Sequence, residues 1–187
     1  MDGFLTTMLA VLLAESGGRT QLLAALTAAH FRQDGAVLAG LLLAIVLNVA
    51  LSAILGGLMH GWVSQDVLTF FYALACLFAG LTMLGSQQDV AGPVHKLGAL
   101  LGSFLAFSLS MLGDRSQFLI LAIAARTDMP LFVAVGGLLG LAIACVPAIV
   151  FREEIARAVP LIRVRRIGGY LFTALGGFLT VVALDLV

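Results

Sequence analysis

The sequence predicts an all-α integral membrane protein with six transmembrane helices, arranged as two inverted three-helix repeats. Three observations predict it: the composition, the position of the charged residues, and an internal repeat. Of the 187 residues, 61% are hydrophobic and only 11% are charged, whereas soluble domains are about 45–50% apolar and about 25% charged. A soluble protein needs charge to cover its surface, so the composition excludes an ordinary cytoplasmic enzyme, a nucleic-acid-binding protein and a disordered chain.

Charge-free windows mark four of the expected helices. A bilayer core about 30 Å thick requires roughly 20 residues of helix, and stretches of about this length without Asp, Glu, Lys or Arg occur four times. Backbone inside a bilayer must satisfy its own hydrogen bonds, which favours helices, and these runs lack the alternating pattern of a β-barrel. The four expected helices lie near residues 37–58, 67–85, 131–150 and 167–185.

Two further segments are long enough to span the membrane only if a polar cluster in their middle is included. With both of them the chain has six helices. The interrupted segments are 4–28, which contains Glu15 and Arg19, and 97–125, which contains Asp114 and Arg115.

An internal repeat relates the two halves of the chain. Seven residues from Gly17 (Gly-Gly-Arg-Thr-Gln-Leu-Leu) align with seven from Gly113 (Gly-Asp-Arg-Ser-Gln-Phe-Leu) at an offset of 96, and four of the seven are identical. Each half has three expected helices, and an odd number forces the second copy to cross the membrane in the opposite direction. We therefore expect residues 1–90 to form the first repeat and residues 91–187 the second, inverted repeat of one membrane domain.

The basic residues predict the orientation. One side of the expected bundle carries seven Lys and Arg side chains, five of them within the connection 152–166, whereas the other side carries only Arg126. The positive-inside rule places the seven-charge side in the cytoplasm, so both termini are expected outside it, with a bacterial inner membrane as the location. We interpret the five-arginine connection as an anchor for topology and lipid headgroups.

Glu15 and Asp114 are the candidate ligands of a transport site. Glu15 follows Phe4 by about eleven residues, which at about 1.5 Å per residue puts it roughly 16 Å into the membrane. Carboxylates at such depth are costly and usually mark substrate or ion pathways. If the two repeats face each other, the two carboxylates converge among neutral oxygen donors. These donors are Thr20, Gln21, Ser116 and Gln117.

Two carboxylates among neutral oxygens suit a hard divalent cation such as Mn²⁺ or Ca²⁺, and the same carboxylates take up protons when the ion leaves. The cation is cargo, so no resident cofactor is expected. Arg19 and Arg115 would balance charge in the empty site, and Arg19 is expected to pair with Glu15 because the two are four residues apart on one helical face. The glycines of the two motifs would let a helix unwind and expose carbonyls as further ligands.

Segments 15–21 (Glu-Ser-Gly-Gly-Arg-Thr-Gln) and 111–117 (Met-Leu-Gly-Asp-Arg-Ser-Gln) resemble the paired Glu-x-Gly-Asp-[Lys/Arg]-[Thr/Ser] motif of a known family. This is the Golgi-type Mn/Ca cation–proton exchanger family, formerly called uncharacterised protein family sixteen. Its motifs stand on the first and fourth of six core helices in inverted repeats. The resemblance implies exchange of Mn²⁺ or Ca²⁺ for protons. By the same resemblance Glu15 and Asp114 bind the cation, and Thr20 and Ser116 contribute.

The chain departs from this pattern once in each motif. Gly18 stands where the family has Asp, and Met111 stands where the family has Glu. A site of four carboxylates therefore becomes a site of two, one from each repeat. We interpret this as a divergent, bacterial-type member, and three consequences stay open: a looser or differently selective cation site, fewer protons exchanged per ion, or lost transport.

Two other functions stay open: a non-transporting membrane protein that keeps the motifs as buried ion pairs, and a small six-helix exporter of another solute. No catalytic constellation, phosphate-binding glycine loop or zinc-ligand spacing is visible, so an enzyme is not expected. The expected partners are the lipid bilayer, a divalent metal ion and protons, with no nucleic acid. The ion, the stoichiometry and the oligomeric state, a homo-oligomer included, stay open.

Overall fold

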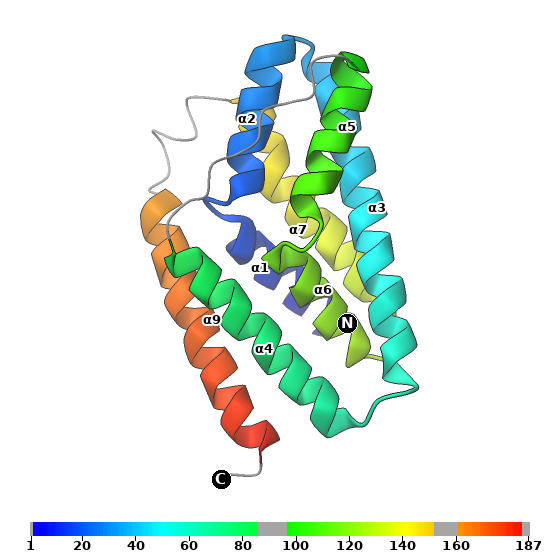
Figure 1. The fold of residues 1–187 in the computed structure, drawn as a ribbon, viewed down its shortest axis with the longest axis vertical. Coiled ribbons are helices and arrows are strands. Elements are labelled where there is room, and N and C mark those ends of the chain that lie inside the picture. The colour runs from blue at the N-terminus through cyan, green and yellow to red at the C-terminus, as the bar shows by residue number, and fades with distance from the viewer. Residues whose placement is uncertain (1, 86–96, 152–160, 185–187) are drawn as a thin grey trace.

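A computed structural model describes residues 2–85, 97–151 and 161–184, and every regular element within these ranges is a helix. The helices pack side by side in an elongated bundle (Figure 1). In chain order they are α1 (Asp2–Glu15), α2 (Arg19–Phe31), α3 (Asp34–His60), α4 (Gln65–Leu84), α5 (Gly98–Met111), α6 (Arg115–Ala125), α7 (Pro130–Val150) and α9 (Leu161–Ala183).

Four of the described helices, α3, α4, α7 and α9, are long and apolar enough to cross a membrane. Their outer faces are apolar as well: Ile54 is 62% exposed, Leu131 73% and Phe178 65%. Such extensive exposed apolar surface is unsuited to water and matches a lipid environment. The chain is therefore an all-helical protein with the surface of an integral membrane protein.

One predicted boundary is wrong. The last helix was expected near residue 167, but α9 already begins at Leu161, so Arg163, Arg165 and Arg166 lie on the helix and not in a connection. Arginine is a good helix former, and its long stem can lie along a helix while the charged end stays in a polar environment. The other two arginines of that predicted connection, Arg152 and Arg157, lie outside the described residues.

The two interrupted segments are each a pair of short helices separated by a break. α1 ends at Glu15 and α2 begins at Arg19, while α5 ends at Met111 and α6 begins at Arg115. Each break contains a glycine with a left-handed backbone, Gly17 at φ 69° and Gly113 at φ 75°. Residues with a β-carbon adopt this conformation at a cost of roughly 1–2 kcal/mol, so glycine permits the break at both places.

Close helix contacts recur at the offset of 96 residues that the sequence repeat shows. A β-carbon built on Gly40 of α3 would lie 2.8 Å from the carbonyl oxygen of Leu100 in α5, and one built on Gly136 of α7 would overlap the carbonyl oxygen of Phe4 in α1. In both contacts the glycine and its partner are each displaced by 96 residues. The packing of α5 on α3 thus corresponds, residue by residue, to the packing of α1 on α7.

The same correspondence holds for α4 and α9, which lie together along one side of the bundle (Figure 1). A β-carbon on Gly80 would lie 2.6 Å from the backbone nitrogen of Thr173, and one on Gly176 would lie 2.7 Å from that of Leu77. These glycines allow the backbones to approach closely, as expected for helix packing in membranes. In Figure 1, α2 and α5 occupy the upper half and α1 and α6 the lower half, so both breaks lie at mid-height.

Candidate functional site

The breaks bring Glu15 and Asp114 together from the two halves of the chain. Glu15 is the last residue of α1 and is fully buried at 0% exposure. Asp114 is the N-cap residue of α6, and its side chain makes no capping hydrogen bond to that helix. The Asp114 carboxyl is close enough to act on Glu15 electrostatically, as are Arg115 and Ser116. The predicted convergence of the two acids is therefore what the fold produces.

The Glu15 carboxyl lacks the partners that a buried charged group requires. Neither of its oxygens has a hydrogen-bond partner of good geometry among the described residues. An ionised carboxylate removed from water is stable only when it is paired, hydrogen-bonded or bound to a metal ion. Two oxygens without partners at mid-height of an apolar bundle are thus a feature that a bound cation would explain.

The predicted pairing of Glu15 with Arg19 on one helical face is wrong, because the helix is broken between them. α1 ends at Glu15, and Arg19 begins a new helix after the left-handed Gly17. The Arg19 side chain instead reaches α5, where its Nη2 donates a hydrogen bond to the carbonyl oxygen of Ser110 at 2.8 Å. Arg19 therefore ties the first break to the helix that precedes the second.

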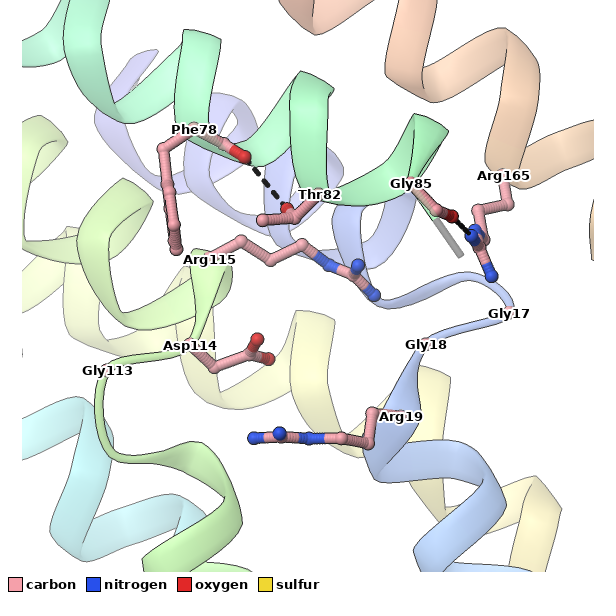
Figure 2. Close-up of a pocket in the computed structure, with 10 residues that line it drawn as sticks. All are labelled: Gly17, Gly18, Arg19, Phe78, Thr82, Gly85, Gly113, Asp114, Arg115 and Arg165. Carbon is pink, nitrogen blue, oxygen red and sulfur yellow. Dashed lines mark hydrogen bonds between the residues drawn. The ribbon is translucent and has the colours of Figure 1, made fainter. Parts of the chain in front are cut away.

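A pocket of about 390 Å³ opens between the two breaks (Figure 2). In Figure 2 the Asp114 carboxylate points into the space between Arg115 and Arg19, whose side chains extend from opposite breaks. Glu15 is not among the residues that line the pocket, but one of its carboxylate oxygens lies next to the lining residue Gly18, 3.1 Å from where a β-carbon on that glycine would be. The lining residues are Gly17, Gly18, Arg19, Phe78, Thr82, Gly85, Gly113, Asp114, Arg115 and Arg165.

Two of the predicted neutral donors are buried at the breaks. Thr20 is 1% exposed and Ser116 2% exposed, and the Thr20 hydroxyl oxygen has no hydrogen-bond partner among the described residues. Each stands one residue into its helix, so the two hydroxyls occupy equivalent places in the two halves. They are available as neutral oxygen ligands close to the carboxylates.

The two predicted glutamine donors hold the breaks in shape. The side-chain oxygen of Gln21 accepts a hydrogen bond from the Gly17 N–H at 3.0 Å, and that of Gln117 accepts one from the Gly113 N–H at 2.6 Å. The Gln21 amide also donates to the carbonyl oxygen of Ala144 in α7 at 2.8 Å. Each glutamine thus satisfies a backbone donor that the break frees from helical bonding.

The carbonyls at the breaks are also used within the protein. The Glu15 carbonyl accepts from the Gly18 N–H at 2.8 Å, and the Met111 carbonyl accepts from the Asp114 N–H at 3.2 Å. The helices do unwind as expected, but these carbonyls bond the chain that follows. Among the described residues no group of three or more His, Cys, Asp or Glu could hold a metal ion, so any cation here depends on two carboxylates and neutral oxygens.

Arg165 is a lining residue that sequence reasoning missed as part of the site. It lies in the first turns of α9, and its guanidinium donates to the carbonyl oxygens of Met83 and Gly85 at the end of α4. The available signal was helical spacing, since Arg165 precedes Gly168, Gly169 and the buried Phe172 on the face that packs on α4. Treating the segment as a connection concealed that spacing.

Comparison with known proteins places the chain in a family. The model of the family described as "Divalent cation/proton antiporter GDT1" matches residues 3–90 and 99–185. The chain belongs to this family. A protein of Vibrio cholerae serotype O1 (strain ATCC 39541 / Classical Ogawa 395 / O395) named "Putative manganese exporter" is 32% identical over 164 residues, covering 87% of this chain and 82% of that protein. No solved structure matches.

Membership of the GDT1 family identifies the chain as a membrane-embedded transporter for a divalent cation. The two matched segments begin 96 residues apart, at residues 3 and 99. This is the offset that relates the two breaks and the glycine contacts. The two matched segments therefore begin at positions separated by the same offset as these features.

Proposed function

We propose that the chain exchanges a divalent cation, Mn²⁺ or Ca²⁺, for protons, and that Glu15 and Asp114 together bind the ion. The observation that carries this proposal is the fully buried Glu15 carboxyl, which has no hydrogen-bond partner within the described part of the chain and lies within electrostatic reach of Asp114. Two carboxylates neutralise one divalent ion, and hard cations prefer such oxygen ligands. The name of the Vibrio cholerae relative makes Mn²⁺ the first ion to test.

In this proposal the remaining residues divide into ligands and supports. Thr20 and Ser116 supply neutral oxygens, whereas Gln21 and Gln117 keep the two breaks in the geometry that directs the acids toward each other. Arg19 and Arg115 supply positive charge that compensates the acids when no cation is bound. The other ligands of the ion would be water, which the adjoining pocket can admit.

Proton coupling follows from the same two carboxylates. Metal binding requires them to be deprotonated, so each arriving cation displaces protons, and protonation on the other side of the membrane releases the cation. When no cation is bound, the protonated, neutral form of the two carboxyl groups also has the lowest free energy in an apolar environment. Exchange therefore needs no further proton-carrying residue.

The proposal includes an inverted arrangement of residues 1–90 and 91–187. It is supported by the equivalent breaks, by the contacts that repeat at an offset of 96, and by the two segments of the family match. Broken helices that meet at the interface of inverted repeats are a common site of transport. With Arg32 and the basic start of α9 toward the cytoplasm, both termini lie outside it, in a bacterial inner membrane.

The test is proton-coupled flux in proteoliposomes that contain a pH-sensitive dye. Mn²⁺, Ca²⁺ or Mg²⁺ added outside should alkalinise the lumen only for the transported ion, because luminal protons leave as that ion enters. Glu15→Gln and Asp114→Asn should each remove the response, because each deletes one of two charged ligands, while Asp66→Asn at the exposed start of α4 should leave it intact. Unchanged flux in either site variant, or no response to any ion from folded protein, would reject the proposal.

A further inference from the structure

Among the described residues, those that line the pocket between the breaks carry more positive than negative charge. They include Arg19, Arg115 and Arg165, with Asp114 as the one described acid. Counting the nearby Glu15 as well leaves three guanidinium groups against two carboxylates among these residues. An excess of fixed positive charge beside an apolar bundle favours a bound anion.

Arg115 points to the ligand most directly. The residue is 6% exposed, and its Nε and Nη2 atoms have no hydrogen-bond partner among the described residues. These two nitrogens form one edge of the guanidinium, from which two parallel N–H bonds can be donated to an oxyanion. Figure 2 shows this side chain extending across the pocket from α6 toward the Gly17–Gly18 turn.

Gly18 provides the room that the Arg115 guanidinium occupies. A β-carbon at position 18 would lie 2.5 Å from Arg115 Nη2 and 3.1 Å from a carboxylate oxygen of Glu15. Glu15, at the end of α1, lies within electrostatic reach of Arg115, but Nε and Nη2 of Arg115 make no hydrogen bond among the described residues. This donor edge is left facing the pocket.

Two helix N-termini add to the same positive field. α2 and α6 begin at the breaks, and neither has a side-chain cap on its first turn. The exposed N–H groups and the helix dipole favour an anion at such a terminus. The glycines and first residues of both breaks, Gly17 to Arg19 and Gly113 to Arg115, line the pocket itself.

The guanidinium groups of the other two arginines, Arg19 and Arg165, are held in place by backbone carbonyl oxygens. Arg165 is held by the carbonyl oxygens of Met83 and Gly85, and Arg19 is held by the carbonyl oxygen of Ser110. Arg19 and Arg165 thus place guanidinium groups at the pocket wall, while Arg115 offers the unused donors.

We propose that this pocket binds a phosphate-type oxyanion, held by the Nε–Nη2 edge of Arg115 between the N-termini of α2 and α6. Donors from more than one direction suit a tetrahedral oxyanion better than a planar carboxylate, and 390 Å³ accommodates it. The same chemistry is offered by inorganic phosphate and by the phosphate of a lipid headgroup. The pocket adjoins the proposed cation site, since Asp114 lines it as well, but oxyanion binding to Arg115 does not depend on cation transport.

The first experiment measures binding of inorganic phosphate to the purified, detergent-solubilised full chain, by calorimetry and by ³¹P line broadening. The matched variants are Arg115→Gln, Arg115→Lys and Arg165→Gln, with Arg163→Gln and Arg166→Gln on exposed positions of α9 as controls. A free-ion site predicts saturable binding that Arg115→Gln weakens by at least about tenfold, since a charge-assisted hydrogen bond is worth about 1.5–3 kcal/mol. The controls should bind as the wild type does.

The second experiment separates the two sources. Native mass spectrometry of protein extracted with phosphatidylglycerol should show retained lipid that Arg115→Gln releases if the ligand is a headgroup. Phosphate binding without lipid retention identifies the free ion as the ligand. Lipid retention without phosphate binding identifies the headgroup. In either case the binding must be lost in Arg115→Gln. Arg115→Lys keeps the positive charge but not the paired donor edge, so it should bind the ligand more weakly than the wild type. Such residual binding would show that a substitution at position 115 leaves the protein folded. If neither ligand binds, or if binding survives Arg115→Gln unchanged in folded protein, the proposal is wrong.

Discussion

The two helix breaks share one backbone design but carry different chemistry. Both contain a left-handed glycine, a glutamine that accepts its N–H, and a carbonyl that bonds the next turn, at positions 96 residues apart. The acidic residues, however, stand at different positions in the two breaks. The first break has Glu15 at the helix end and Gly18 at the cap, whereas the second has Met111 and Asp114.

This difference distinguishes the residues that form the breaks from the acidic residues that would bind the ion. Glycine and glutamine are retained in both halves because they create the break. The acids have no part in that geometry, since Glu15 and Met111 end their helices equally well and are equally buried at 0% and 1% exposure. The result is an asymmetric site, with one deep carboxylate from the first half and one pocket-facing carboxylate from the second.

The strongest test of this equivalence exchanges the deep acid between the halves. Glu15→Met alone should reduce Mn²⁺ flux by at least about 100-fold, because losing even an outer-shell partner of a metal ligand costs about 10–100-fold. Adding Met111→Glu should return measurable flux, since residue 111 occupies the equivalent position. Proteoliposome flux checks both, and a double variant no better than the single one would show that the two positions do not face the same ion.

The next test concerns packing. Gly40→Ala and Gly136→Ala should each destabilise the protein by about 1–3 kcal/mol or more, because the new methyl group meets the backbone of α5 or α1. The two losses should be similar if the halves are equivalent. Thermal unfolding in detergent measures them, with Gly177→Ala as the control, since a β-carbon there meets nothing within 4 Å. If only one of the two substitutions lowered the thermal stability, the two helix contacts would not be equivalent.

A smaller effect is expected when the first break is made more like the second. Gly18→Asp would place a carboxylate beside Arg115; the backbone at φ −78° is compatible with a side chain, but the guanidinium of Arg115, 2.5 Å from the new β-carbon, must move to make room. The new acid should occupy the free guanidinium edge, so phosphate binding should weaken by about tenfold, the value of one charge-assisted hydrogen bond. Mn²⁺ affinity should not fall, because a negative charge is added. Titration of both ligands into the same variant measures the opposite trends; phosphate binding that is unaltered would exclude Arg115 as its donor.

Much of this architecture was predictable because it rests on local signals. Charge-free windows identify α3, α4 and α7, and the repeat of Gly-x-Arg-[Thr/Ser]-Gln identifies both breaks. The family assignment also follows from those residues and is confirmed by the match over both segments.

What the sequence did not reveal depends on tertiary contacts. The helix ends between Glu15 and Arg19, so their expected pairing on one face fails, and Arg19 bonds Ser110 across the bundle instead. Arg165 joins the pocket only because α9 begins early and packs on the end of α4. Periodicity also cannot show that the side-chain oxygens of Gln21 and Gln117 accept from backbone N–H groups across a turn; whether they also bind the cation stays a prediction.

The central claim is that one cation is shared between Glu15 and Asp114. Equilibrium Mn²⁺ binding to purified protein, followed by electron paramagnetic resonance together with the protons released, tests it most directly. The account predicts one saturable Mn²⁺ per chain, proton release on binding, tighter binding as pH rises, and loss of both signals in Glu15→Gln and in Asp114→Asn. Saturable binding that persists in either variant, or that releases no protons, would contradict it.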